Sequence, residues 1–145
     1  MWANYDYTNF PIVSVQFNNK IEKEEEFTEF LKKWILLYND KKDFTFIFDT
    51  VDVGIPNISY CYKMTKFIRR LKKFEHQYLQ KSLILVSNKY IKYLLNLIFR
   101  LQQPVATVYI YNVNKDIPYD YNILLNKISK NELDDFSVIK PYNNV

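Results

Sequence analysis

The chain has 145 residues, enough for one domain with its own core, and 48% of them are apolar, which argues against disorder. A formal net charge of +4 is too small for a dedicated DNA-binding tail, and a single glycine excludes the glycine-rich loops that cradle phosphates. A single cysteine excludes an internal disulfide and fits a reducing compartment, and no apolar run reaches the roughly 20 residues of a membrane-spanning helix. We therefore expect one cytoplasmic domain, without a metal or cofactor.

The first part of the chain predicts strands around one helix. Pro11 to Phe17 alternates apolar and polar residues, as in a strand with one buried face, and the aromatic stretch Trp2 to Phe10 precedes it as a candidate edge strand. From Glu24 to Tyr38 apolar residues recur every three or four positions, which predicts an amphipathic helix. Phe44 to Phe48 is short and rich in aromatics and predicts a buried central strand.

A glycine and a proline between Val51 and Ile58 predict a loop, after which a second helix begins near Ser59. Its apolar residues, from Tyr60 to Phe74, fall on one face, and the bases fall on the other. Ser82 to Val86 predicts another buried strand.

A third helix is expected from Ser87 to Pro104, where the proline breaks the pattern. The residues expected on its inward face are Tyr90, Ile91, Leu94, Leu95, Ile98 and Phe99. Val105 to Tyr111 then predicts a final strand, and Tyr121 to Ile128 a last helix within a surface-packed tail.

This alternation of strands and helices predicts an α/β fold, in which a mostly parallel sheet of four to five strands is flanked by helices. The domain core spans about residues 11–111, and residues 112–145 form a C-terminal extension.

The segment from Phe44 to Lys73 adds a resemblance. An apolar strand ends at Asp49, a short loop follows, and Ser59 opens a helix. This order resembles the core of STAS domains of the SpoIIAA type, the fold of bacterial anti-sigma-factor antagonists. The resemblance implies a STAS architecture and a protein partner, and it places Ser59 at the serine that a partner kinase phosphorylates. The motif departs from the family's Asp-Ser-Ser-Gly and reads Pro56-Asn57-Ile58-Ser59-Tyr60.

Two interpretations of Ser59 stay open. A phosphate there would add about −2 charge at a helix N-terminus, where unpaired amides and the helix dipole favour anions. Alternatively, Ser59 is an N-cap that stabilises the helix by about 1 kcal/mol. The expected interaction site is the loop from Asp49 to Ser59 together with the first turns of the basic helix that follows, and its candidate residues are Asp49, Thr50, Asn57, Ser59 and Tyr60.

The bases of the second helix form a candidate anion site for phosphate, anionic lipid or nucleic acid. The aromatic residues of this helix are expected on its inward face, which does not favour a stacking platform for nucleic acid, and a solvated helix face is the alternative. The bases are Lys63, Lys66, Arg69, Arg70, Lys72 and Lys73.

The remaining candidates for chemistry are few. Asp49 and Asp52 are candidates for metal binding or acid–base catalysis, or ordinary turn residues. Cys61 lies at a helix start, where a thiol pKa falls, or is a packing residue, and His76 has no recognisable partners. We therefore expect a non-catalytic interaction module that docks a protein partner, within a larger assembly or a homo-oligomer. Some of the abundant tyrosines and phenylalanines are expected to form an exposed interface.

Overall fold

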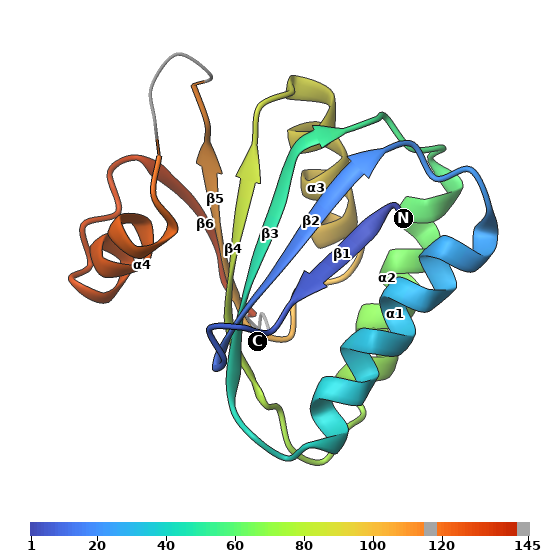
Figure 1. Ribbon diagram of the computed structural model, residues 1–145, viewed down its shortest axis with the longest axis horizontal. Helices are drawn as coiled ribbons and strands as arrows, with labels where there is room; N and C mark the ends of the chain where they lie inside the picture. The colour runs from blue at the N-terminus through green and yellow to red at the C-terminus, as the bar shows by residue number, and fades with distance from the viewer. Residues whose placement is uncertain (115–118, 142–145) are drawn as a thin grey trace.

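The computed structural model describes residues 1–114 and 119–141, which form one six-stranded sheet with helices on both faces (Figure 1). The strands are β1 (Ala3–Asp6), β2 (Ile12–Asn19), β3 (Phe44–Val53), β4 (Leu79–Val86), β5 (Thr107–Asn112) and β6 (Phe136–Ile139). The helices are α1 (Glu24–Asn39), α2 (Ser59–Leu71), α3 (Lys89–Leu101) and α4 (Tyr121–Ser129).

The strands lie in the sheet in the order of the sequence, β1-β2-β3-β4-β5-β6. The four central strands are parallel, whereas β1 and β6 pair antiparallel at the two edges. The α/β class is confirmed, but the expected mostly parallel sheet of four to five strands is corrected to a mixed sheet of six. The turn between β1 and β2 is too short for the crossover that a parallel pair needs, so these strands pair antiparallel. After β5 the chain forms α4 and comes back beside the C-terminal end of β5, so β6 also runs antiparallel to its neighbour.

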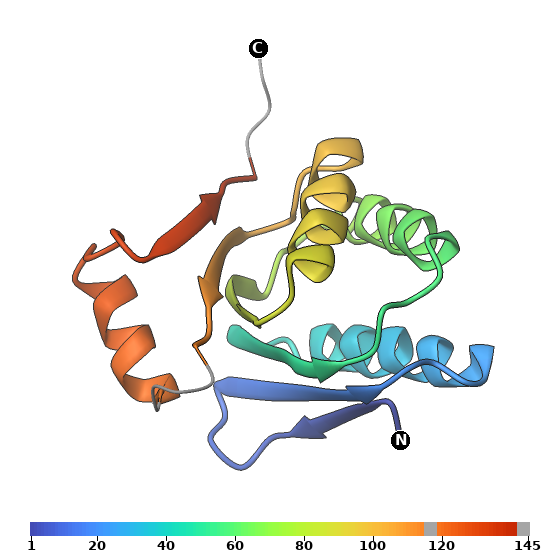
Figure 2. The ribbon, with the colours of Figure 1, turned by 90° about the horizontal axis from the view of Figure 1, so that it is seen from above.

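The helices divide unequally between the two faces of the sheet. Each of α1, α2 and α3 connects two neighbouring parallel strands, and every connection moves one position in the same direction. Because such crossovers are right-handed, all three helices lie on one face, whereas α4 lies on the other (Figure 2). The expected C-terminal tail is therefore a structural part of the fold, since α4 covers a face and β6 completes the sheet.

A cluster of aromatic side chains fills the space between the sheet and the three helices. Phe46, fully buried on β3, lies 4.5 Å from Phe48 and 4.9 Å from Trp34 between ring centroids, and Trp34 in turn contacts Phe67 of α2. Most of the phenylalanines are therefore core residues rather than an exposed interface. A second, aliphatic cluster lies between the sheet and α4 and contains Ile47, Leu83, Leu85, Val113, Leu124 and Ile128.

The strand β3 is longer than expected, because it continues to Val53 beyond the point where the loop was predicted. Its register against β2 shifts: Gln16 pairs with Asp49, but Asn18 pairs with Asp52. The extra residue in β3 offsets the alternation of side chains and brings Asp52 back to the sheet face of Asp49. The irregular connection to α2 is thus limited to residues 54–58.

Candidate functional site

Asp49 is a buried carboxylate in the middle of the central strand β3, and both of its oxygens are engaged. Its side chain lies on the α4 face of the sheet and is 7% exposed. The amide of Val51 donates to Oδ1 at 3.1 Å, and the hydroxyls of Tyr121 and Tyr119 donate to Oδ2 at 2.7 and 3.3 Å. Asp49 therefore ties the start of α4 to the sheet.

The two tyrosines are held in their neutral form. Burial raises the pKa of Tyr121, and the hydrogen bond to Asp49 raises it further. Burial and the charge of Asp49 raise the pKa of Tyr119 to about 12, with a smaller contribution from Asp52. Asp52 itself is exposed, so the two aspartates share a face but differ in environment. Asp49 has the contacts of a structural anchor, whereas Asp52 faces solvent.

The first residues of the expected Asp49–Ser59 loop belong to β3 and form hydrogen bonds with neighbouring parts of the sheet. The Thr50 hydroxyl donates to the carbonyl of Leu85 at 2.6 Å, and the Ser87 hydroxyl donates to that of Val51 at 3.1 Å. These bonds tie β3 to β4 and to the start of α3. The exposed part of the site is therefore narrower than expected and starts after β3.

The capping role predicted for Ser59 belongs to Asn57. Ser59 is the first residue of α2, and its amide donates to Oδ1 of Asn57 at 2.9 Å, while the Tyr60 amide donates to the Asn57 carbonyl. Ser59 is exposed, and within residues 1–114 and 119–141 its hydroxyl has no hydrogen-bond partner. The assignment of Ser59 as the cap is corrected, because Ser59 is already the first residue of the helix and the oxygen that accepts its amide belongs to Asn57.

Tyr60 and Lys63 face the neighbouring helix α1. The Tyr60 ring packs against Phe27 at 4.9 Å and is half-buried, and the Lys63 ammonium lies over the same ring at 4.9 Å. Lys63 also forms an ion pair with Glu24, a hydrogen bond that lowers the pKa of Glu24 and raises that of Lys63. Both are therefore engaged in contacts with α1, and Glu24 partly compensates the charge of Lys63.

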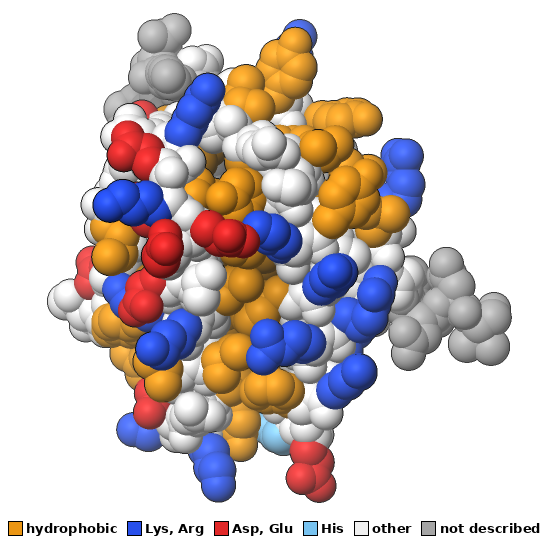
Figure 3. Space-filling model, turned by 90° about the vertical axis from the view of Figure 1, so that its right-hand side faces the viewer, with side chains coloured by type: hydrophobic (Ala, Val, Ile, Leu, Met, Phe, Trp, Pro, Cys, Tyr) orange, Lys and Arg blue, Asp and Glu red, His pale blue; other side chains and the backbone are white. Residues whose placement is uncertain are grey.

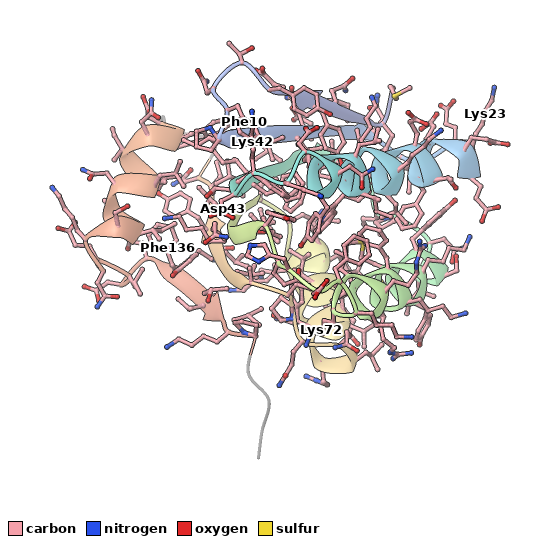
Figure 4. All side chains as sticks on the ribbon, turned by 90° about the horizontal axis from the view of Figure 1, so that it is seen from below. Phe10, Lys23, Lys42, Asp43, Lys72 and Phe136 are labelled. Atoms are coloured by element: carbon pink, nitrogen blue, oxygen red, sulfur yellow. The ribbon has the colours of Figure 1, made fainter. Side chains whose placement is uncertain are left out.

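The other bases of α2 line its outer face. Lys66, Arg69, Arg70 and Lys73 are exposed, and Lys72 is half-exposed at the end of the helix (Figure 4). Arg69 donates from Nε to Oε1 of Gln102 at 3.4 Å, which links the end of α2 to the end of α3. In Figure 3 these bases gather at the lower right, whereas acids and bases alternate over α1 on the left.

Several exposed side chains of this surface were not expected from the sequence. Tyr62 of α2 is 51% exposed, so the aromatic residues of this helix are not all inward. On α3, Tyr90 and Tyr93 are 65% and 64% exposed, although Tyr90 was predicted to face inward. We define the α2–α3 face as the exposed residues Tyr62, Lys66, Arg69 and Arg70 of α2, Lys73 just beyond its end, and Lys89, Tyr90, Tyr93, Arg100 and Leu101 of α3.

A charge signal in the sequence marks the same face. Residues 53–114 contain ten bases and one acid, Glu75, although the whole chain carries 16 acids. The two helices α2 and α3 contain no acid at all. Their positive charge is thus uncompensated along both helices, apart from the ion pair of Lys63.

The other candidates for chemistry are not assembled into a site. Cys61 is buried between α2 and α3, and burial raises the pKa of its thiol, so the expected lowering at a helix start is wrong. His76 lies beyond the C-terminal end of α2, with Nε2 4.0 Å from Asp43 and its ring against Tyr78. Ser59 lies at the opposite end of the same helix, so these groups form no catalytic triad.

A polar hollow of about 420 Å³ opens beside α4 on the other face of the sheet. Ser14 of β2 and Tyr121 of α4 line opposite sides of it. Among the described residues, no three His, Cys, Asp or Glu side chains come together in a way that could hold a metal ion. None of the helices in this part of the chain is long and apolar enough to cross a membrane.

Comparison with known protein families, with curated proteins and with solved structures found no match to this chain.

Proposed function

We propose that the chain is a non-catalytic protein-interaction module resembling a STAS domain, which works in the cytoplasm. Its docking surface consists of the exposed loop residues Ile55, Asn57, Ile58 and Ser59 and the outer face of α2. The partner binds reversibly to this surface.

The observation that carries this proposal is the exposure of apolar side chains beside uncompensated bases. Ile55 and Ile58 are 46% and 50% exposed in a loop of five residues, and Tyr62 follows one turn into the helix. Exposed apolar groups that gather in this way mark interaction sites, and tyrosine and arginine are enriched at protein interfaces. In Figure 3, hydrophobic side chains gather at the upper right, directly above the bases of α2.

The groups that would serve a catalytic role have structural contacts instead. Both oxygens of Asp49 accept hydrogen bonds, and the Cys61 thiol is buried with a raised pKa. Asp52 is exposed and has no basic partner in the described structure. A binding role therefore accounts for the exposed residues of the chain better than a catalytic one.

Ser59 is the natural site for regulation of this docking. Its exposed hydroxyl lies at the first residue of α2, within the docking surface. A phosphate at this position would add negative charge between the apolar loop and the bases of α2. Substitution of Ser59→Asp is therefore expected to weaken partner binding, whereas Ser59→Ala leaves it unchanged.

The second candidate function is binding of an anionic ligand, lipid or nucleic acid by α2. The exposed ring of Tyr62 among the bases favours it, because aromatic rings beside bases can stack on nucleobases. Salt separates the two functions, since binding to polyanions weakens steeply as salt rises.

Affinity capture from the cells that express the protein tests the proposed function. The wild-type chain is compared with Ile58→Asp, which places a charge in the docking surface, and with Leu36→Asp, which makes the same change at an equally exposed residue of α1. We expect one or more proteins that are retained by the wild type and by Leu36→Asp and lost with Ile58→Asp. Equal recovery on all three chains, or recovery of nucleic acid alone, contradicts the proposal.

A further inference from the structure

The surface between α2 and α3 has an apolar row on α3, of which only Leu94 belongs to the core. Tyr90, Leu94, Leu97 and Leu101 recur at the spacing that places side chains on one side of α3. Leu94 packs with Cys61 and Ile68, so this side of α3 faces α2. Tyr90 and Leu101, at the ends of the row, are exposed, and Leu97 is half-exposed. The row is about 16 Å long, since an α-helix rises 1.5 Å per residue.

Bases border this row on both sides. On α2, Arg69 lies on the edge nearest to α3, because it donates a hydrogen bond to Gln102 at the end of α3. Tyr62 precedes Arg69 by seven residues, which is two helical turns, and therefore lies on the same edge. Arg100 and Lys89 lie on the outer side of α3. Because neither helix contains an acid, a partner with apolar anchors would meet positive charge along its whole length.

We infer that the α2–α3 face binds an acidic amphipathic helix of a partner protein. Its apolar side would lie along the row from Tyr90 to Leu101, and its acidic flanks would face Lys66, Arg69 and Arg100. This inference rests on the proposed function and names the partner's chemistry. Apolar anchors at helical spacing in a groove, flanked by charges of opposite sign, are how helices dock in grooves.

The row itself favours a helix over the other polyanions. Leu97 and Leu101 are aliphatic and offer nothing to a sugar-phosphate backbone, which would need only the bases and the tyrosines. The row also lies along the junction of two helices rather than on a protruding tip, which suits a rod-shaped ligand better than a lipid surface.

Fluorescence anisotropy with a defined probe tests the inference. The probe is a labelled helical peptide of about 18 residues, five turns, with leucines at i, i+4, i+7 and i+11, a few glutamates that flank the leucine row, and alanines and glutamines elsewhere to keep it helical. The control peptide has the same composition in an order that spreads the leucines around the helix. We expect the amphipathic peptide to bind the full chain at least about tenfold more tightly than the control peptide. Equal binding of both peptides shows a general attraction of charges and overturns the inference.

Matched variants locate the binding on the molecule. Leu97→Ser with Leu101→Ser removes the apolar anchors, and Arg69→Glu with Arg100→Glu reverses the flanking charge; each pair is expected to weaken binding about tenfold. Lys32→Glu with Lys130→Glu makes the same charge change at exposed residues elsewhere and is expected to leave binding unchanged. Circular dichroism checks that all chains are folded. If the two pairs on the face bind as tightly as the wild type, the inference is wrong.

Competing ligands complete the experiment. Single-stranded poly(U) and phosphatidylserine vesicles are added to the same chains. If either one binds the wild type more tightly than the amphipathic peptide does, and Arg69→Glu with Arg100→Glu abolishes this binding, the face binds that polyanion and the inference is wrong. If the chain self-associates and this prevents the peptide from binding, the α2–α3 face binds a second copy of the chain and the inference is wrong. If affinity capture recovers a protein that Ile58→Asp loses, but the amphipathic peptide does not bind, the proposed function is supported and this inference is wrong.

Discussion

Asp49 shows what a sequence can and cannot indicate about one residue. Its place on a buried strand was predictable from the run Phe44 to Phe48 and the aspartate that follows, although the strand continues beyond it to Val53. Its partners were not, because Tyr119 and Tyr121 are about 70 residues away and α4 had no predicted position. The interpretation as an ordinary turn residue and the interpretation as a catalytic acid both missed the role of an anchor for α4.

The hydrogen bond from Tyr121 to Asp49 is expected to contribute measurably to stability. Tyr121→Phe removes a 2.7 Å bond to a buried carboxylate and should lower the free energy of unfolding by about 1.5–3 kcal/mol. Tyr119→Phe removes a 3.3 Å bond and should cost less. Urea unfolding of the two variants measures the difference. An equal or reversed order would show that Tyr121 is not the stronger anchor.

The raised tyrosine pKa values predict a loss of stability in alkali. Burial raises the pKa of Tyr38, as well as that of Tyr119, to about 12, whereas an unfolded tyrosine titrates near 10. The neutral rings therefore stabilise the fold fully below pH 10, and this stability is lost as the pH rises from 10 toward 12. Urea midpoints and absorbance at 295 nm, measured across this range, should show late ionisation together with falling stability. Ionisation of every tyrosine near pH 10 in the folded chain would contradict this account.

The start of α2 offers a comparison between two neighbouring candidates for the cap. Asn57→Ala removes the oxygen that accepts the Ser59 amide and should cost about 1 kcal/mol. Ser59→Ala removes a hydroxyl without a partner in the described structure and should change stability by less than about 0.5 kcal/mol. Thermal unfolding of the two single variants decides between them. A larger effect at Ser59 would restore it as the cap.

At the scale of elements, the sequence predicted the helices and strands that have a regular apolar pattern, but it did not predict which strands pair over long distances in the chain. The positions of α1, α2 and α3 followed from apolar residues at helical spacing, and β2, β3 and β4 from short apolar runs. β6 was missed because Phe136–Ile139 has four residues, none fully buried, and becomes a strand only by pairing with β5. The edge strand β1 was expected from the aromatic stretch Trp2 to Phe10, whereas β6 and the antiparallel pairing at both edges, which makes the sheet mixed, could not be read from local sequence.

The attachment of α4 to the sheet can be tested with two adjacent residues. Leu124 is buried against the aliphatic cluster, whereas Ile123 is 59% exposed. Leu124→Ala should lower the free energy of unfolding by about 2–5 kcal/mol, and Ile123→Ala should have little effect. Hydrogen exchange in β6 should increase with the first variant alone. If both variants behave alike, α4 is not packed as described.

At the scale of the whole molecule, charge separates the chain into regions that its net charge hides. The segment 53–114 is strongly basic, while Glu22 to Glu29 at the start of α1 is acidic. The basic second helix was visible in the sequence. The exposed tyrosines and the row of leucines on α3 could not be predicted in the same way, because their exposure depends on how α2 and α3 pack. The spacing of Tyr90 alone suggested an inward residue.

Site-resolved photo-crosslinking tests the central claim, that the α2–α3 face and its loop dock a partner protein. A photoreactive amino acid is placed at Ile58, at Tyr93 or, as a control on α1, at Leu36, all of which are exposed. Irradiation in the cells that express the protein should give the same protein adduct at Ile58 and Tyr93 and none at Leu36. Adducts at all three positions alike, or at neither Ile58 nor Tyr93, would contradict the account.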